Sequence, residues 1–124
     1  MKLGLIGLGN VGKIHLRNCL RLEKARLVGV SDISEKALLF AKKRGVKNLY
    51  TDYNKMLNDK DMDAVVISLP NFLHSECSIK AAEAGKNIFL EKPFARNVEE
   101  GGKILSSVRR SGVRLMLGYN LRFN

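Results

Sequence analysis

Short apolar runs along this chain alternate with longer stretches in which apolar and polar residues are mixed. The first and fourth runs, LGLIG and AVVIS, are apolar throughout, which predicts strands that are buried on both faces. The other runs are short and mostly β-branched or leucine-rich, as strands are. We therefore expect six strands, over Leu3–Gly7, Ala25–Ser31, Lys47–Tyr50, Ala64–Ser68, Asn87–Leu90 and Val113–Leu117.

The stretches between these runs have the spacing of apolar residues that is typical of helices. Ser34 and Asn97 are residue types that cap a helix at its start, and Gly45, Gly85 and Gly112 are the type that ends one. The expected helices and helical turns are Asn10–Leu22, Ser34–Arg44, Tyr53–Asn58, Phe72–Ala84 and Val98–Arg110.

A strand followed by a helix, repeated along the whole chain, is the pattern of βαβ units in a parallel sheet. Right-handed crossovers then predict the strand order 3-2-1-4-5-6, a doubly wound α/β (Rossmann) sheet with helices on both faces. No internal repeat, low-complexity segment or linker interrupts the pattern. We therefore expect one dinucleotide-binding domain over residues 1–124.

The glycine motif GLGNVG at residues 7–12 lies between the first expected strand and the first expected helix. A G-x-G-x-x-G pattern is weak by itself, but in this position it is typical of a dinucleotide site. Gly7 permits the tight turn, Gly9 allows the backbone to approach a pyrophosphate, and Gly12 allows the helix to pack close to the sheet.

Two further features concern the nucleotide itself. The amides of Asn10 and Val11 begin the helix and are expected to bind the phosphates, aided by the helix dipole. Asp32 ends the second strand about 20 residues after the motif, where a carboxylate accepts both ribose hydroxyls. Because Ile33 follows it, rather than an arginine, the sequence favours NAD over NADP, although Lys36 would soften the repulsion of a 2′-phosphate.

The histidines and cysteines do not indicate a metal or redox site. His15 lies one turn inside the first helix, and no second histidine or carboxylate is spaced with it as a metal ligand. We favour a packing or supporting role near the phosphates over a catalytic one. Cys19 and Cys77 each lie in an expected helix, far apart and without a C-x-x-C motif, which predicts free, partly buried thiols.

The formal net charge of +10 raises the question of a nucleic-acid partner. The basic residues do not form one stripe: residues 42–44 close one expected helix and residues 109–110 another, where the helix dipole favours cations. Few aromatic residues lie among them to stack bases. We expect no nucleic-acid partner, and an acidic partner domain would balance the same charge.

No apolar run approaches the roughly 20 residues that are needed to cross a bilayer. The first residues, MKLGLIGLGN, form a short apolar run broken by glycines, which predicts a strand rather than a signal peptide. With 45% hydrophobic residues the chain is able to bury a core. We therefore expect a cytoplasmic domain that does not contact the membrane.

The second half of the chain carries further motifs, and with them the sequence resembles the Gfo/Idh/MocA oxidoreductases, the glucose–fructose oxidoreductase and inositol dehydrogenase family. EKP, at residues 91–93 after the fifth apolar strand, is the most specific of these features, because a general Rossmann domain does not need it. In chain order the resemblance rests on GLGNVGKIH, the strand before Asp32, LPNFLH, AGKNIFLEKPFA and GYNLRFN.

The resemblance implies roles for particular residues. Glu91 and Lys92 would lie beside the nicotinamide ribose, and Lys92 would also contact the substrate hydroxyl that becomes a carbonyl. A cation there stabilises developing oxyanion charge and helps to move a proton. The Lys92–Pro93 bond is implied to be cis. Four residues after the fourth strand would line the cofactor groove, namely Ser68, Pro70, Asn71 and His74.

The resemblance also implies what this chain does not contain. Asn120 and Arg122 match the segment that leads to a C-terminal substrate domain, and that domain supplies the acid–base histidine. We expect the substrate domain to be absent from this chain, so that the chain alone binds NAD weakly and turns over polyols negligibly. The full enzyme would act on a sugar or cyclitol-like substrate and could form a homo-oligomer.

Two other functions have the same fold and stay open at this point. A regulatory nucleotide-sensing domain has the same length, glycine motif and terminal aspartate, but it has no need of the lysine in EKP. A catalytically inactive relative that serves in interactions is the other alternative, and the fold alone does not separate it from an enzyme.

Overall fold

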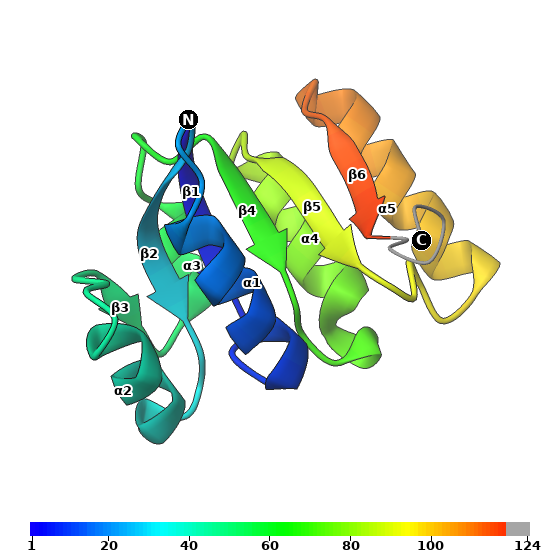
Figure 1. Ribbon diagram of the computed structural model, residues 1–124. Coiled ribbons are helices and arrows are strands. Elements are labelled where there is room, and N and C mark those ends of the chain that lie inside the picture. Colours follow the sequence, from blue (N-terminus) through cyan, green and yellow to red (C-terminus); the bar gives the residue numbers. More distant parts are fainter. Residues whose placement is uncertain (119–124) are drawn as a thin grey trace.

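The computed structural model describes residues 1–118 and contains one six-stranded sheet with helices on both faces (Figure 1). The strand order is β3-β2-β1-β4-β5-β6, and every pair of neighbours is parallel. This confirms the predicted doubly wound sheet. The strands are β1 (Lys2–Ile6), β2 (Arg26–Ser31), β3 (Leu49–Tyr50), β4 (Ala64–Ile67), β5 (Asn87–Glu91) and β6 (Leu115–Gly118).

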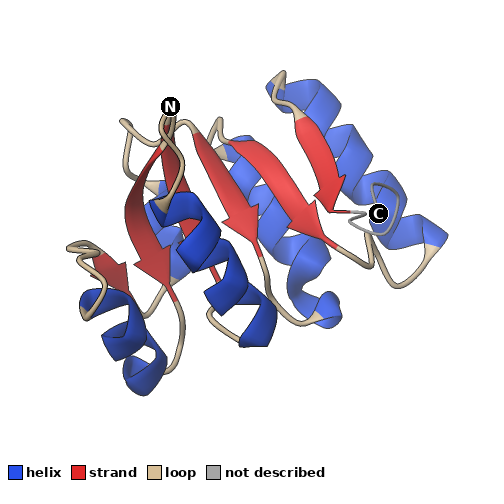
Figure 2. Cartoon of the chain, viewed as in Figure 1, coloured by secondary structure: helices blue, strands red, loops and turns tan. Residues whose placement is uncertain are grey.

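The helices divide between the two faces of the sheet, as Figure 2 shows. The front face carries α1 (Asn10–Leu20) and α2 (Glu35–Lys42), and the back face carries α3 (Tyr53–Leu57), α4 (His74–Glu83) and α5 (Val98–Ser111). A 3₁₀ turn, η1 (Asn71–Leu73), precedes α4. Each crossover from strand to helix to strand therefore returns to the same parallel sheet.

The two faces have separate apolar cores because successive residues of a strand point to opposite sides. In β1, Leu5 packs with Leu16 of α1 on the front face, and Ile6 packs with Ile67 and Ile104 on the back face. β1 and β4 lie in the middle of the sheet, and apart from the first residue of β1 both strands are buried throughout. This is the burial that their uninterrupted apolar runs predict.

The predicted helix caps are confirmed. The Ser34 side chain accepts a hydrogen bond from the Ala37 N–H at 3.2 Å, and the Asn97 side chain accepts one from the Glu100 N–H at 2.8 Å. Gly112 ends α5 with a φ of 71°. Each cap satisfies backbone groups that a helix end leaves without a partner, which stabilises the helix by about 1 kcal/mol.

Several elements differ in their bounds from the sequence-based expectation. α1 ends at Leu20 rather than Leu22, β3 contains only Leu49 and Tyr50, and β6 begins at Leu115 rather than Val113. The helix α4 begins at His74 rather than Phe72, because the residues after Pro70 first form the 3₁₀ turn. The sequence GYNLRFN lies almost wholly outside the described residues, and Asn120 and Arg122 with it.

Both cysteines are free and buried, as expected of thiols that serve as small core residues. Burial raises the pKa of the Cys19 thiol and raises that of Cys77 to about 12. The cation-rich helix end of α2 also follows the expectation, since the Arg44 guanidinium donates to the Phe40 carbonyl at 3.1 Å. Within residues 1–118, no helix is long and apolar enough to cross a membrane.

Candidate functional site

A cleft lies at the carboxyl edge of the sheet, where the loops that follow β1, β2, β4 and β5 meet. All the strands point toward this edge in Figure 1, so residues far apart in sequence converge there. The predicted site residues that line the cleft are Gly7, Gly9, Asn10, Val11, Asp32, Ser68, Pro70, Glu91 and Lys92.

The glycine loop fits closely against the end of β4. Gly7 has a φ of +98°, and a Cβ at this position would collide with the Ser68 carbonyl. A Cβ on Gly12 would collide with the Gly7 carbonyl oxygen, so this glycine sets the distance between α1 and the loop. A Cβ on Gly9 would meet no atom within 4 Å. The open side of the loop is therefore at Gly9, where the backbone is accessible to a ligand.

The start of α1 is suited to an anion. Its N-cap is Gly9, which offers no side-chain hydrogen bond, and its first turn contains no acidic residue. The first amides of a helix have no partner within the helix, and the helix dipole places a partial positive charge at the same point. Asn10 and Val11, which begin α1, both line the cleft.

Asp32 is held rigidly beside the glycine loop. One carboxylate oxygen accepts a hydrogen bond from the Leu8 N–H at 2.7 Å, and the other accepts one from the Ser34 N–H at 2.8 Å. Each carboxylate oxygen has a second lone pair. The residue is therefore oriented by the backbone and still able to accept hydrogen bonds from two hydroxyl groups in the cleft.

The other end of the cleft is formed by Glu91 and Lys92. The Glu91 Oε1 lies 2.6 Å from the His15 Nε2, and its Oε2 accepts a hydrogen bond from the Lys92 N–H at 3.2 Å. The Lys92 ammonium has no hydrogen bond or ion pair to any side chain or carbonyl among residues 1–118. The Lys92–Pro93 bond is cis, as the resemblance implied. Lys92 thus lines the same cleft as Asp32.

Three predicted site residues do not line the cleft. Gly12 lies behind the loop, as described above, and Asn71 lies in the exposed 3₁₀ turn. His74, expected in the wall of the groove, is only 1% exposed. Its Nδ1 lies 2.7 Å from the Pro93 carbonyl oxygen, and its Nε2 lies 2.8 Å from that of Leu69. It supports the loops of the cleft from within the fold.

His15 has the packing and supporting role that the sequence favoured, and its partners are residues of β5. It contacts Glu91 as described and packs edge-to-face on Phe89, with ring centroids 5.6 Å apart. No pattern in the sequence pairs His15 with Glu91, because the two residues come from elements separated by three strands and three helices along the chain.

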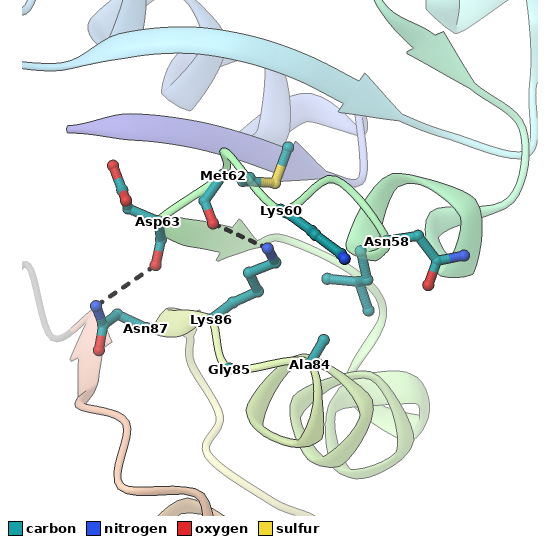
Figure 3. Close-up of a pocket in the computed structure, with 9 residues that line it drawn as sticks. Asn58, Lys60, Met62, Asp63, Ala84, Gly85, Lys86 and Asn87 are labelled. Atoms are coloured by element: carbon teal, nitrogen blue, oxygen red, sulfur yellow. Dashed lines mark hydrogen bonds between the residues drawn. The ribbon is translucent and has the colours of Figure 1, made fainter.

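A second pocket lies at the opposite, amino edge of the sheet, between the turn before β4 and the turn before β5 (Figure 3). Lys86, only 4% exposed, points across it, and its ammonium donates to the carbonyl oxygens of Asp59 and of Met62, the latter at 2.9 Å. Lys86 therefore joins two turns of the fold, a role that the sequence analysis did not detect.

Comparison with known proteins identifies related domains. The family model described as an oxidoreductase family with an NAD-binding Rossmann fold matches residues 1–119. An uncharacterised oxidoreductase of Bacillus subtilis is 36% identical over 98% of this chain. A myo-inositol 2-dehydrogenase of Thermotoga maritima is 34% identical over 100% of it. This chain spans 36% and 37% of the length of these two relatives.

A solved structure has the same arrangement of strands and helices. The scyllo-inositol dehydrogenase of Lactobacillus casei, determined with bound NAD(H) and scyllo-inositol, superimposes with a TM-score of 0.94 and 31% identity. The match covers 100% of this chain and 37% of the other. The resemblance that the motifs indicated is therefore confirmed, and so is the fold that it implied.

Proposed function

We propose that this chain, which belongs to the oxidoreductase family with an NAD-binding Rossmann fold, holds NAD in the cleft at the carboxyl edge. It would serve a dehydrogenase that acts on a hydroxyl of an inositol or another sugar-like polyol. The observation that carries this proposal is the convergence of three features in one cleft: the open glycine loop, the Asp32 carboxylate and the Lys92 ammonium.

The fit of a dinucleotide follows from the two ends of the cleft. The open backbone at Gly9 and the amides of Asn10 and Val11 would receive the pyrophosphate. The Asp32 carboxylate would accept hydrogen bonds from both hydroxyls of the adenosine ribose, since Leu8 and Ser34 already fix its orientation. Gly12 would act by bringing α1 close to the loop.

The nicotinamide end would lie against the residues that follow β4 and β5. Ser68 and Pro70 form this part of the wall, with Asn71 at its rim, and Glu91 and Lys92 stand opposite. When bound, NAD supplies the position that accepts or returns a hydride. The Lys92 ammonium would donate a hydrogen bond to the reacting oxygen and stabilise negative charge there. A sensor domain would have no use for such a cation.

The substrate class rests on the relatives. The names of the Thermotoga maritima and Lactobacillus casei proteins specify inositols, and a cation beside a developing oxyanion suits the oxidation of any such hydroxyl. We propose a cytoplasmic protein, because two free cysteines are typical of a reducing compartment.

Calorimetric titration of the chain with NAD and NADP tests the proposal. We expect tighter binding of NAD, because a 2′-phosphate would meet the Asp32 carboxylate with a repulsion of up to about 4 kcal/mol at 4 Å and an effective dielectric constant near 20. Asp32→Asn, which keeps the size of the side chain and removes the charge, should narrow the difference. Absence of binding of either cofactor, or tighter binding of NADP, would contradict the proposal.

A further inference from the structure

The chain contains two histidines, and both contact the residues on either side of Lys92. His15 of α1 reaches Glu91, the residue before Lys92, and His74 of α4 reaches Pro93, the residue after it. Neither histidine lines the cofactor cleft. Their shared position around one lysine is not explained by the proposed binding of NAD.

His15 contacts the side chain of Glu91. The distance between Nε2 and Oε1 is 2.6 Å, and both side chains are 18% exposed. The second oxygen of the same carboxylate accepts the Lys92 N–H, so the carboxylate connects the histidine to the backbone of the lysine. The ring of His15 is fixed in turn by its edge-to-face contact with Phe89.

His74 contacts the backbone on the other side of Lys92. Its two ring nitrogens face the carbonyl oxygens of Pro93 and Leu69, and carbonyl oxygens only accept hydrogen bonds. The ring is fully enclosed at the start of α4. It therefore joins the loop after β5 to the loop after β4, which forms the facing wall of the cleft.

We propose that His15 and His74 are positioning residues that hold Lys92 in the cofactor cleft by fixing its two neighbours in the chain. The Lys92 ammonium has no partner among residues 1–118, so within the described part of the chain its position depends on the backbone that carries it. His15 fixes the backbone through Glu91, and His74 fixes it through Pro93. This inference rests on the proposed function, since it assumes that Lys92 and Glu91 face the nicotinamide half of NAD.

Variants of His15 test the inference with two ligands, NAD and ADP-ribose, which lacks the nicotinamide. The amide nitrogen of glutamine occupies nearly the position of Nε2, whereas that of asparagine is too short to reach Glu91. We expect His15→Asn to weaken NAD binding by about tenfold, as loss of a hydrogen bond to a charged group does. His15→Gln should restore most of the affinity.

ADP-ribose binding by the same variants shows whether each is folded and whether its phosphate site is intact. We expect it to change by less than about twofold. Asn18→Ala, on the same helix and one turn further along, is the matched control and should leave the binding of both ligands unchanged.

Two variants of His74 separate its two contacts. Asparagine retains a nitrogen near the position that faces Pro93, and glutamine retains one near the position that faces Leu69. Because the contact with Pro93 is the one that fixes Lys92, we expect His74→Asn to bind NAD more tightly than His74→Gln does, relative to ADP-ribose.

The outcomes separate this inference from the function on which it rests. A wild-type chain that binds neither ligand contradicts the proposed function. A wild-type chain that binds both, with a His15→Asn variant that weakens both equally or neither, overturns the positioning role alone. If the His74 variants do not fold, the comparison of His15→Asn with His15→Gln decides by itself.

Discussion

The two ends of β5 each carry a lysine, and the two lysines have opposite surroundings. Lys86 immediately precedes the strand at the amino edge, is buried, and is bonded to two backbone carbonyls. Lys92 follows the strand at the carboxyl edge, is exposed in a cleft, and has no partner for its ammonium among residues 1–118. The same residue type thus serves the fold at one edge and is available to a ligand at the other.

The difference follows from the geometry of a parallel sheet. At the amino edge the turn that leads into β4 presents carbonyl oxygens, and a lysine satisfies them because an ammonium only donates. At the carboxyl edge the glycine loop and the start of α1 present amides instead. The Lys92 cation and these amides both favour anionic groups, whereas the Asp32 carboxylate in the same cleft favours hydroxyl groups.

The largest expected effect concerns Lys92. In any longer polypeptide in which this domain supports dehydrogenase turnover, Lys92→Met should lower kcat by about 10²- to 10⁴-fold, because the positive charge beside the reacting oxygen is lost. In urea unfolding of the chain, the same change should alter the free energy of unfolding by less than about 0.5 kcal/mol. Lys103→Met is the control, because Lys103 is an exposed lysine of α5 whose ammonium lies 3.4 Å from a carboxylate oxygen of Glu99. A large loss of stability in Lys92→Met would remove the contrast between the two edges.

The reverse result is expected at the amino edge. Lys86→Met keeps the length of the side chain but leaves the Met62 carbonyl oxygen without a donor and the Asp59 carbonyl oxygen with the Met62 N–H alone. The free energy of unfolding should therefore fall by about 1–3 kcal/mol. Calorimetry on the folded variant should give the wild-type affinity for NAD. Lys60→Met, in the same pocket but exposed, should have little effect on either measurement. Equal stability of Lys86→Met and Lys60→Met would show that the carbonyl contacts do not matter.

Gly12 and Gly9 of the glycine loop show the same difference between a residue that serves the fold and one that is available to a ligand, with smaller expected effects. Gly12→Ala places a Cβ against the Gly7 carbonyl oxygen, so we expect α1 to shift and the chain to lose about 1–3 kcal/mol of stability. Gly9→Ala meets no protein atom within 4 Å, and unfolding of this variant should match wild type. Its methyl group occupies the space proposed for the pyrophosphate, so NAD affinity should fall by about tenfold or more. Undiminished binding by Gly9→Ala would place the phosphates elsewhere.

The smallest expected effect concerns the chemical reactivity of the two buried cysteines, Cys19 and Cys77, in the core between the two edges. Burial raises the pKa of Cys77 to about 12 and also raises that of Cys19, so little of either thiol is ionised at neutral pH. The rate of reaction with a disulfide reagent in the native chain should be slow and should keep rising through pH 9 without a plateau. In urea both thiols should react rapidly, with a plateau near the ordinary cysteine pKa of about 8.5. A native rate that levels off below pH 9 would contradict the predicted environment of these thiols.

Most of the fold could be predicted from local patterns in the chain. The buried runs at β1 and β4, the caps Ser34 and Asn97, and the glycine at 112 depend on near neighbours alone. The handedness of βαβ connections then determines the strand order, which the structure confirms. The glycine loop and Asp32 could be assigned to one cleft by the same argument, since parallel strands carry their following loops to one edge.

The tertiary structure alone decided which side chains meet. His15 and Glu91 are 76 residues apart in sequence, and Lys86 reaches carbonyls 24 and 27 residues away. His74 was expected to line the groove, yet the 3₁₀ turn before α4 directs its ring into the fold. Periodicity specifies which face of an element is buried, but it does not specify the partner across that interface. That choice depends on the packing of several elements at once, for which no local pattern exists.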